Sequence, residues 1–133
     1  MNELISATIN NCIDLIYEQK MKHSFTNHVY VSAIISNNNI IYGLNVPKSG
    51  IVCSEMVALG QALLIDNVIN LSYIITISLD KNNKPFIANM CGNCRQNLYY
   101  ICPSIKVVLG YPENYYTVNL SELFPYPHYR DIT

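Results

Sequence analysis

The chain has 133 residues and a net charge of −1; half of its residues are hydrophobic and only 13% are charged. This length favours a single domain over residues 1–133 with a substantial buried core. The eight Lys and Arg residues are scattered, so the sequence lacks the basic stripe of a protein that binds RNA or DNA, and we expect a small-molecule partner.

The N-terminal part of the chain predicts a helix followed by a hairpin. Apolar residues recur at helical spacing from about Asn2 to Lys20, which is typical of an amphipathic helix. Val29 to Ser36 is rich in β-branched residues, and Ile40 to Leu44 resumes the strand pattern after Asn37-Asn38-Asn39, which tolerates left-handed turn conformations. Two strands joined by such a turn predict a β-hairpin.

The middle of the chain predicts a loop, a helix and a strand. Pro, Ser and Gly residues interrupt regular structure between Asn45 and Val52, so this segment is predicted to be an active-site loop. The apolar residues from Cys53 to about Asp66 suit a buried helix, and the run from Leu71 to Leu79 predicts a strand that ends at a polar turn over Asp80 to Lys84. The predicted helix therefore begins at a cysteine.

The C-terminal part predicts one more helix and two short strands. The helix runs from Cys91 through about Cys102, where Pro103 closes it. Ile105 to Leu109 and Tyr116 to Val118 are the strands, and Leu120 to Phe124 is a helical turn. The order helix, hairpin, helix, strand, helix, strand, strand predicts an α/β sandwich with helices covering a mixed five-stranded sheet.

Cysteine use and charge content bear on the compartment and the assembly of the protein. Five cysteines are an odd number, and their spacing fits metal binding better than a disulfide framework, which favours a reducing cytoplasm. No apolar run approaches the roughly eighteen residues of a membrane helix, so we expect a soluble, unexported protein with no membrane partner. The low charge content indicates either an oligomer or a habit of using Asn, Ser and Tyr in place of Lys and Glu.

Two short motifs place three thiols and one carboxylate in a pattern typical of a catalytic zinc site. They are Cys53-Ser54-Glu55 and Cys91-Gly92-Asn93-Cys94. Catalytic zinc usually takes three protein ligands and keeps a fourth position for water, so Cys53, Cys91 and Cys94 are the predicted ligands of Zn²⁺. The same pattern occurs in zinc nucleobase deaminases, whose proton carrier occupies the position of Glu55.

Two other uses of these cysteines are less consistent with the sequence. A structural zinc normally has four protein ligands, and neither Cys12 nor Cys102 belongs to an obvious second ligand pair; both fall on apolar faces typical of core residues. A redox dithiol would not require the upstream Cys-x-Glu. If both motifs begin helices, the sulfurs lie at helix N-termini, where the dipole favours thiolates.

The stretch from Val52 to Gly60, followed by Cys91-Gly92-Asn93-Cys94-Arg95-Gln96, resembles the cytidine deaminase family, whose usual forms read Cys-Ala-Glu and Pro-Cys-Gly-x-Cys-Arg-Gln. Gly60 and the tail from Leu120 to Pro125 make it most similar to the blasticidin S deaminases. The likeness runs from about Ala33 to the C-terminus. It implies a three-layer α/β/α sandwich, a homotetramer, and zinc-dependent hydrolytic deamination of a cytosine nucleoside.

The resemblance also implies roles for single residues. Glu55 would take the proton of water and hand it to the ring N3, and would later help to protonate the leaving ammonia. Ser54 would offer its backbone N–H to the base carbonyl. Asn45 would contact the sugar and the base edge, or merely cap the loop. Met90, Met56 and Pro47 stand where the family often has Pro, Arg and Glu. The substrate stays open among cytidine, deoxycytidine and a blasticidin S-type nucleoside, and a zinc-containing binding or assembly protein remains the alternative.

Overall fold

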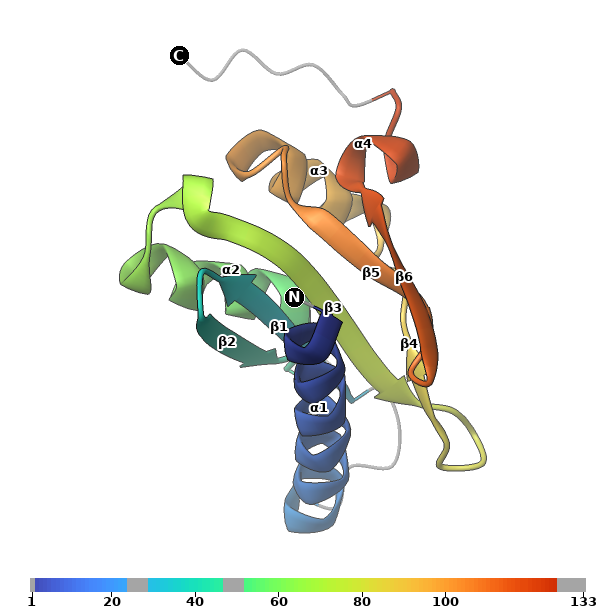
Figure 1. Cartoon of the computed structure of the whole chain (residues 1–133). Helices are drawn as coiled ribbons and strands as arrows, with labels where there is room; N and C mark the ends of the chain where they lie inside the picture. The colour runs from blue at the N-terminus through green and yellow to red at the C-terminus, as the bar shows by residue number, and fades with distance from the viewer. Residues whose placement is uncertain (1, 24–28, 47–51, 127–133) are drawn as a thin grey trace.

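The computed structural model describes residues 2–23, 29–46 and 52–126 of the chain. A mixed β-sheet forms the middle layer, and helices cover both of its faces (Figure 1). Helix α1, Asn2–His23, covers one face, whereas α2, Ser54–Ile65, and α3, Gly92–Ile101, cover the other. The predicted three-layer α/β/α sandwich is therefore confirmed.

The sheet has one strand more than the sequence predicts. Its strands are β1 Tyr30–Ser36, β2 Asn39–Leu44, β3 Leu71–Leu79, β4 Pro85–Ile87, β5 Lys106–Tyr111 and β6 Asn114–Asn119. Their order is β2-β1-β3-β5-β6, with β4 paired to β3, and only β3 and β5 are parallel. The expectation of five strands is wrong because β4 has only three residues, too few to show an alternating pattern.

The remaining predicted elements are confirmed with small changes at their ends. The hairpin turn uses Asn37 in a left-handed conformation, with φ of 54°. A short 3₁₀ helix, η1 Val68–Asn70, precedes β3, and the C-terminal helical turn is α4, Leu120–Leu123. Helix α1 extends to His23 because its last turn keeps basic residues at the negative end of the helix dipole. No helix among the described segments is both long and apolar enough to cross a bilayer.

The central strands β1 and β3 are apolar on both faces because each face packs against a helical layer. Val31, Ala33 and Ile35 of β1 lie in the cluster with α1, whereas Ile34 lies in the cluster with α2 and α3. Cys12 is fully buried among the first of these groups, which confirms its predicted place in the core. The face that carries Ile34 is the one on which both cysteine motifs lie.

Helix α2 is held against the sheet at both of its ends. A Cβ atom on Gly43 of β2 would lie 2.4 Å from the backbone nitrogen of Ala58 and 2.6 Å from the carbonyl oxygen of Ser54. Only glycine permits this approach. Beyond the other end of the helix, Ser36 donates a hydrogen bond of 2.6 Å to the Asp66 carboxylate. The start of α2, with the first cysteine motif, is therefore fixed over the sheet.

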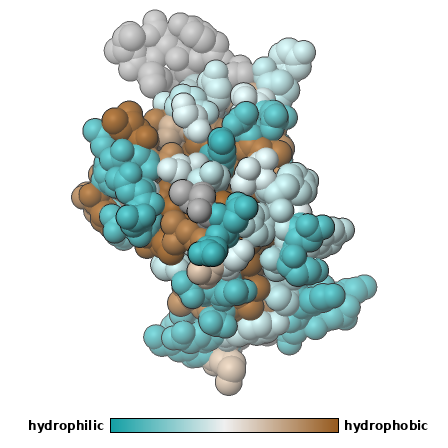
Figure 2. Space-filling view, viewed as in Figure 1, coloured by the Kyte–Doolittle hydropathy of each residue, from teal (hydrophilic) through white to brown (hydrophobic). Residues whose placement is uncertain are grey.

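The last turn of α2 is exposed, although the sequence predicts a buried helix. Leu64 is 84% exposed and Leu63 is 42% exposed, so the prediction of burial is wrong there. Figure 2 shows hydrophobic side chains gathered on the side of the molecule where α2 lies, and the exposed ones include Leu63, Leu64, Ile65 and Ile69. The spacing of apolar residues along a helix is the same whether the apolar face packs against the sheet or is exposed to solvent.

Substitution of Gly43 by Ala should destabilise the protein and displace the start of α2. We expect a loss of about 1–3 kcal/mol in the free energy of unfolding, the usual cost of overpacking, measured by denaturant unfolding. Gly60→Ala is the matched control, because Gly60 lies in the exposed middle of α2 with no atom within 4 Å of an added Cβ. It should stabilise the helix by about 1 kcal/mol. Equal effects of the two substitutions would contradict the close approach.

Candidate metal centre

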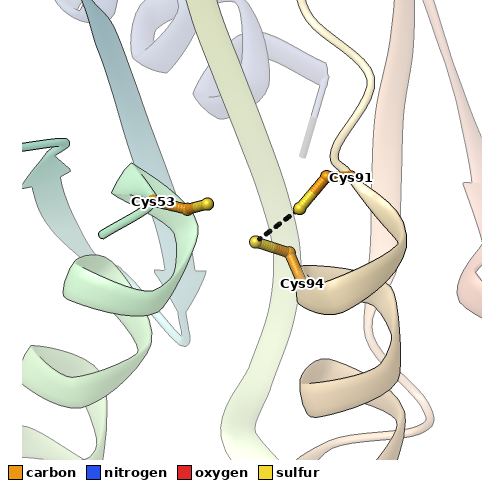
Figure 3. A group of neighbouring side chains, drawn as sticks. All are labelled: Cys53, Cys91 and Cys94. Carbon is orange, nitrogen blue, oxygen red and sulfur yellow. Dashed lines mark hydrogen bonds between the residues drawn. The ribbon is translucent and has the colours of Figure 1, made fainter. Parts of the chain in front are cut away.

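The three cysteines predicted as metal ligands converge at the N-termini of two helices. Cys53 is the N-cap of α2, Cys91 is the N-cap of α3, and Cys94 lies in the first turn of α3. All three sulfur atoms lie within 4.8 Å of one another (Figure 3), and the Sγ atoms of Cys91 and Cys94 are 3.5 Å apart. All five cysteines lie in the described segments, and each is a free thiol.

The spacing of the sulfur atoms fits a tetrahedral metal ion. Zinc–sulfur bonds of ~2.3 Å at tetrahedral angles place two ligand sulfurs about 3.8 Å apart, which lies between the 3.5 Å contact and the 4.8 Å limit of this cluster. Within the described segments, no fourth His, Cys, Asp or Glu joins the group. Three protein ligands are the number typical of a catalytic site, whereas structural zinc sites use four.

The three sulfurs differ in exposure. Cys94 is buried, Cys53 is half-buried and Cys91 is exposed. Burial, and then the neighbouring Glu55 carboxylate, raise the pKa of the Cys94 thiol, and burial also raises the pKa of Cys53. Since thiolates are the form that binds metal, a cation must compensate for the ionisation of these two groups, and metal binding releases their protons.

Cys91 differs from the other thiols because of its place at the helix start. Burial acts to raise its pKa, but the backbone N–H groups of Cys94 and Asn93 and the two neighbouring thiols outweigh this effect, so the pKa is lowered. By contrast, burial raises the pKa of the core thiol Cys102 to about 11. The predicted stabilisation of thiolate at a helix N-terminus is thus seen for Cys91 but not for Cys53 and Cys94, whose pKa values are raised by burial.

The Glu55 carboxylate lies beside the sulfur cluster and is only 6% exposed. Its Oε1 atom is 4.0 Å from the Sγ of Cys94, while its Oε2 accepts a hydrogen bond of 3.1 Å from the hydroxyl of Thr76. Glu55 is the second residue of α2 and does not belong to the group of ligand atoms. A buried carboxylate next to a potential metal, but outside its ligand group, is arranged as a proton carrier requires.

Three buried hydroxyl groups, not predicted from the sequence, form a closed ring of contacts with this carboxylate. Ser32 of β1 lies directly opposite Thr76 of β3, and their hydroxyl oxygens are 2.6 Å apart. The Ser32 hydroxyl is also 2.7 Å from that of Ser54, which lies 3.4 Å from Glu55 Oε1. We call Ser32, Ser54 and Thr76 the hydroxyl ring. The sequence shows small polar residues within two apolar strands, but several of them, such as Ser36 and Ser78, lie outside the ring.

Asn45 lies at the end of β2, where it joins the hairpin to the predicted active-site loop. Its side-chain oxygen accepts a hydrogen bond of 2.8 Å from the backbone N–H of Tyr30, and its own N–H donates to the Tyr30 carbonyl at 3.2 Å. Asn45 is therefore bonded to the backbone at the start of β1 through both its side chain and its main chain. Its contact with substrate stays a prediction. Most of that loop, residues 47–51 with Pro47, lies outside the described residues.

The residues that flank the second motif have structural contacts. Met90 is buried in the core cluster of α2 and α3, directly before the ligand Cys91. Arg95 donates a hydrogen bond of 3.3 Å to the carbonyl oxygen of Leu123 and so ties α3 to α4. The guanidinium thus connects two helices.

Comparison with known proteins adds no relative: no family model matches the chain, and no curated protein matches it. The fold and the site define the protein as an α/β sandwich with three converging cysteines that could hold a metal ion. Any assignment of function therefore depends on the geometry of the site and on the motifs of the sequence.

Proposed function

We propose that the protein is a zinc-dependent aminohydrolase that removes the amino group of a cytosine nucleoside, consuming water and giving the uracil product and ammonia. The observation that carries the proposal is the buried Glu55 carboxylate beside three converging thiols. A structural zinc site needs no such acid. The resemblance to the cytidine deaminases, and most closely to the blasticidin S deaminases, supports the same assignment.

Each residue of the site has a separate role in the proposed reaction. A zinc ion held by Cys53, Cys91 and Cys94 would supply Lewis acidity for the activation of water. Glu55 Oε1, on the side of the sulfurs, would take one proton from the attacking water and deliver it to the ring N3, where it stays in the uracil product. The same carboxylate would then carry the second proton, from the new hydroxyl at C4, to the amino group, which leaves as ammonia. The backbone N–H of Ser54, in the first turn of α2, has no acceptor within the helix and would bind the base carbonyl.

The substrate class follows from the same features. The scattered basic residues favour a nucleoside over a nucleic-acid polymer, and cytidine, deoxycytidine and a blasticidin S-type nucleoside are the candidates. We propose a homotetramer in a reducing cytoplasm, since the exposed apolar side chains at the end of α2 offer a surface for subunit contacts. The five free thiols agree with that compartment.

Turnover should depend on the metal and on the nucleoside. Purified protein is expected to release ammonia and to lower the cytosine absorbance with at least one of cytidine, deoxycytidine and blasticidin S. Removal of the metal with a chelator should abolish both signals, and added Zn²⁺ should restore them. A folded, zinc-loaded protein that turns over none of the three would contradict the proposal and favour a binding or assembly role.

A further inference from the structure

We propose that the hydroxyl ring of Ser32, Ser54 and Thr76 holds the Glu55 carboxylate in the orientation that proton transfer requires, so that all three are positioning residues. The inference rests on the proposed role of Glu55 as the proton carrier. The three hydroxyl-bearing residues are at most 4% exposed. They come from three separate elements, β1, α2 and β3. Ser54 and Thr76 contact the carboxylate, and Ser32 links these two hydroxyls.

A count of protons fixes the direction of the hydrogen bonds in the ring. Four contacts link the three hydroxyls and the carboxylate, but the hydroxyls supply only three protons and an ionised carboxylate supplies none. If the longest contact, 3.4 Å from Ser54 to Oε1, carries no proton, the other three form a directed chain. Any other choice leaves two oxygens facing each other at 2.6–3.1 Å without a proton.

This direction gives the two carboxylate oxygens of Glu55 different tasks. Ser54 donates to Ser32, Ser32 donates to Thr76, and Thr76 donates to Oε2. Oε2 is thereby anchored, and Oε1 lies on the side of the sulfur cluster, 4.0 Å from the Sγ of Cys94. The terminal torsion of a glutamate is soft, so the Thr76 hydrogen bond is what selects this orientation.

The placement of the ring in the sheet favours a positioning role over simple packing. Ser32 and Thr76 are cross-strand partners on the face where Ile34 and Ile74 pack against α2 and α3. Buried hydroxyls stabilise a core less than apolar side chains unless they are paired. Within the described segments, the hydroxyls of Ser32 and Thr76 are paired with each other, with Ser54 and with Glu55. A buried network that is fully paired specifies a single arrangement of its members.

The test compares substitutions that remove or keep one hydroxyl. Thr76→Val removes it with little change of shape, Thr76→Ser keeps it, and Ser78→Ala removes a buried hydroxyl of the same strand that donates to the Val29 carbonyl, outside the ring. We expect Thr76→Val to lower kcat by about 10²-fold, as displacement of a reacting group does, with KM and zinc content unchanged. Thr76→Ser should restore kcat to within a few-fold, and Ser78→Ala should leave it unchanged.

A second variant, Ser32→Ala, and a structural measurement test the same role of the hydroxyl ring. Ser32→Ala, which removes the middle of the chain of hydrogen bonds, should lower kcat by a smaller factor, again without a change in KM. Crystal structures of the full chain should show the Glu55 carboxylate turned or in several conformers in Thr76→Val and in its native position in Thr76→Ser. This comparison does not require turnover.

The outcomes separate this inference from the proposed function. A wild-type protein without turnover contradicts the deaminase proposal, and the crystallographic comparison then decides on the ring alone. A carboxylate that keeps its position in Thr76→Val overturns the positioning role. So does an active wild type in which Thr76→Val and Ser32→Ala retain full kcat, or in which Thr76→Ser loses as much as Thr76→Val.

Discussion

Glu55→Gln should lower kcat by about 10²–10⁴-fold, the contribution expected of a positioned proton carrier, while the protein keeps its fold and its zinc. The amide preserves the size of the side chain and can still accept from Thr76 at its oxygen, but it cannot take a proton from water. Ammonia release under substrate saturation measures the effect, with metal analysis of the same sample.

The control for this experiment is Glu122→Gln, because Glu122 is an exposed carboxylate of α4 that only caps its own helix. Its replacement should leave kcat unchanged. An active Glu55→Gln protein, with turnover near that of the wild type, would end the assignment of Glu55 and the proposed mechanism with it.

Cys94→Ala should abolish stoichiometric zinc binding and, with it, turnover. The protein should also lose the stabilisation that zinc provides, which for a ligand at a hundred times its Kd is about 2.7 kcal/mol. Thermal unfolding with and without added Zn²⁺ measures this loss, because the melting temperature of the variant should no longer respond to the metal.

Cys12→Ala is the matched control, because Cys12 and Cys94 are both fully buried but only Cys94 lies in the cluster. Burial raises the pKa of Cys12 to about 12, so its thiol is neutral and contributes through packing alone. The Cys12 variant should lose some stability yet bind one zinc. If both variants kept zinc, or both lost it, the ligand assignment would be wrong.

The parts of the fold that the sequence predicted well depend on local patterns. The period of α1 and the Asn-rich turn of the hairpin are each contained in one short segment, so neither needs knowledge of distant partners. The strand β4 was missed because it exists only through its pairing with the end of β3. The exposure of Leu63 and Leu64 was missed because periodicity does not show what covers a helix face.

The site likewise has parts that depend on local motifs and parts that depend on the pairing of distant strands. Two motifs of a few residues each, Cys-x-Glu and Cys-x-x-Cys, predict Cys53, Cys91 and Cys94, and the structure places these residues at the starts of two helices. The link between Ser32 and Thr76 spans 44 positions of the sequence and depends on the register of β1 against β3. No local spacing contains that register, so the hydroxyl ring became visible only in the folded chain.

The central claim is that three cysteine sulfurs hold one zinc ion and leave a coordination position open beside Glu55. X-ray absorption at the zinc edge of the purified protein tests it most directly, together with the zinc content per chain. We predict one zinc per chain with three sulfur neighbours at ~2.3 Å and one oxygen or nitrogen neighbour. Four sulfur ligands, or a protein that binds no zinc, would contradict the account.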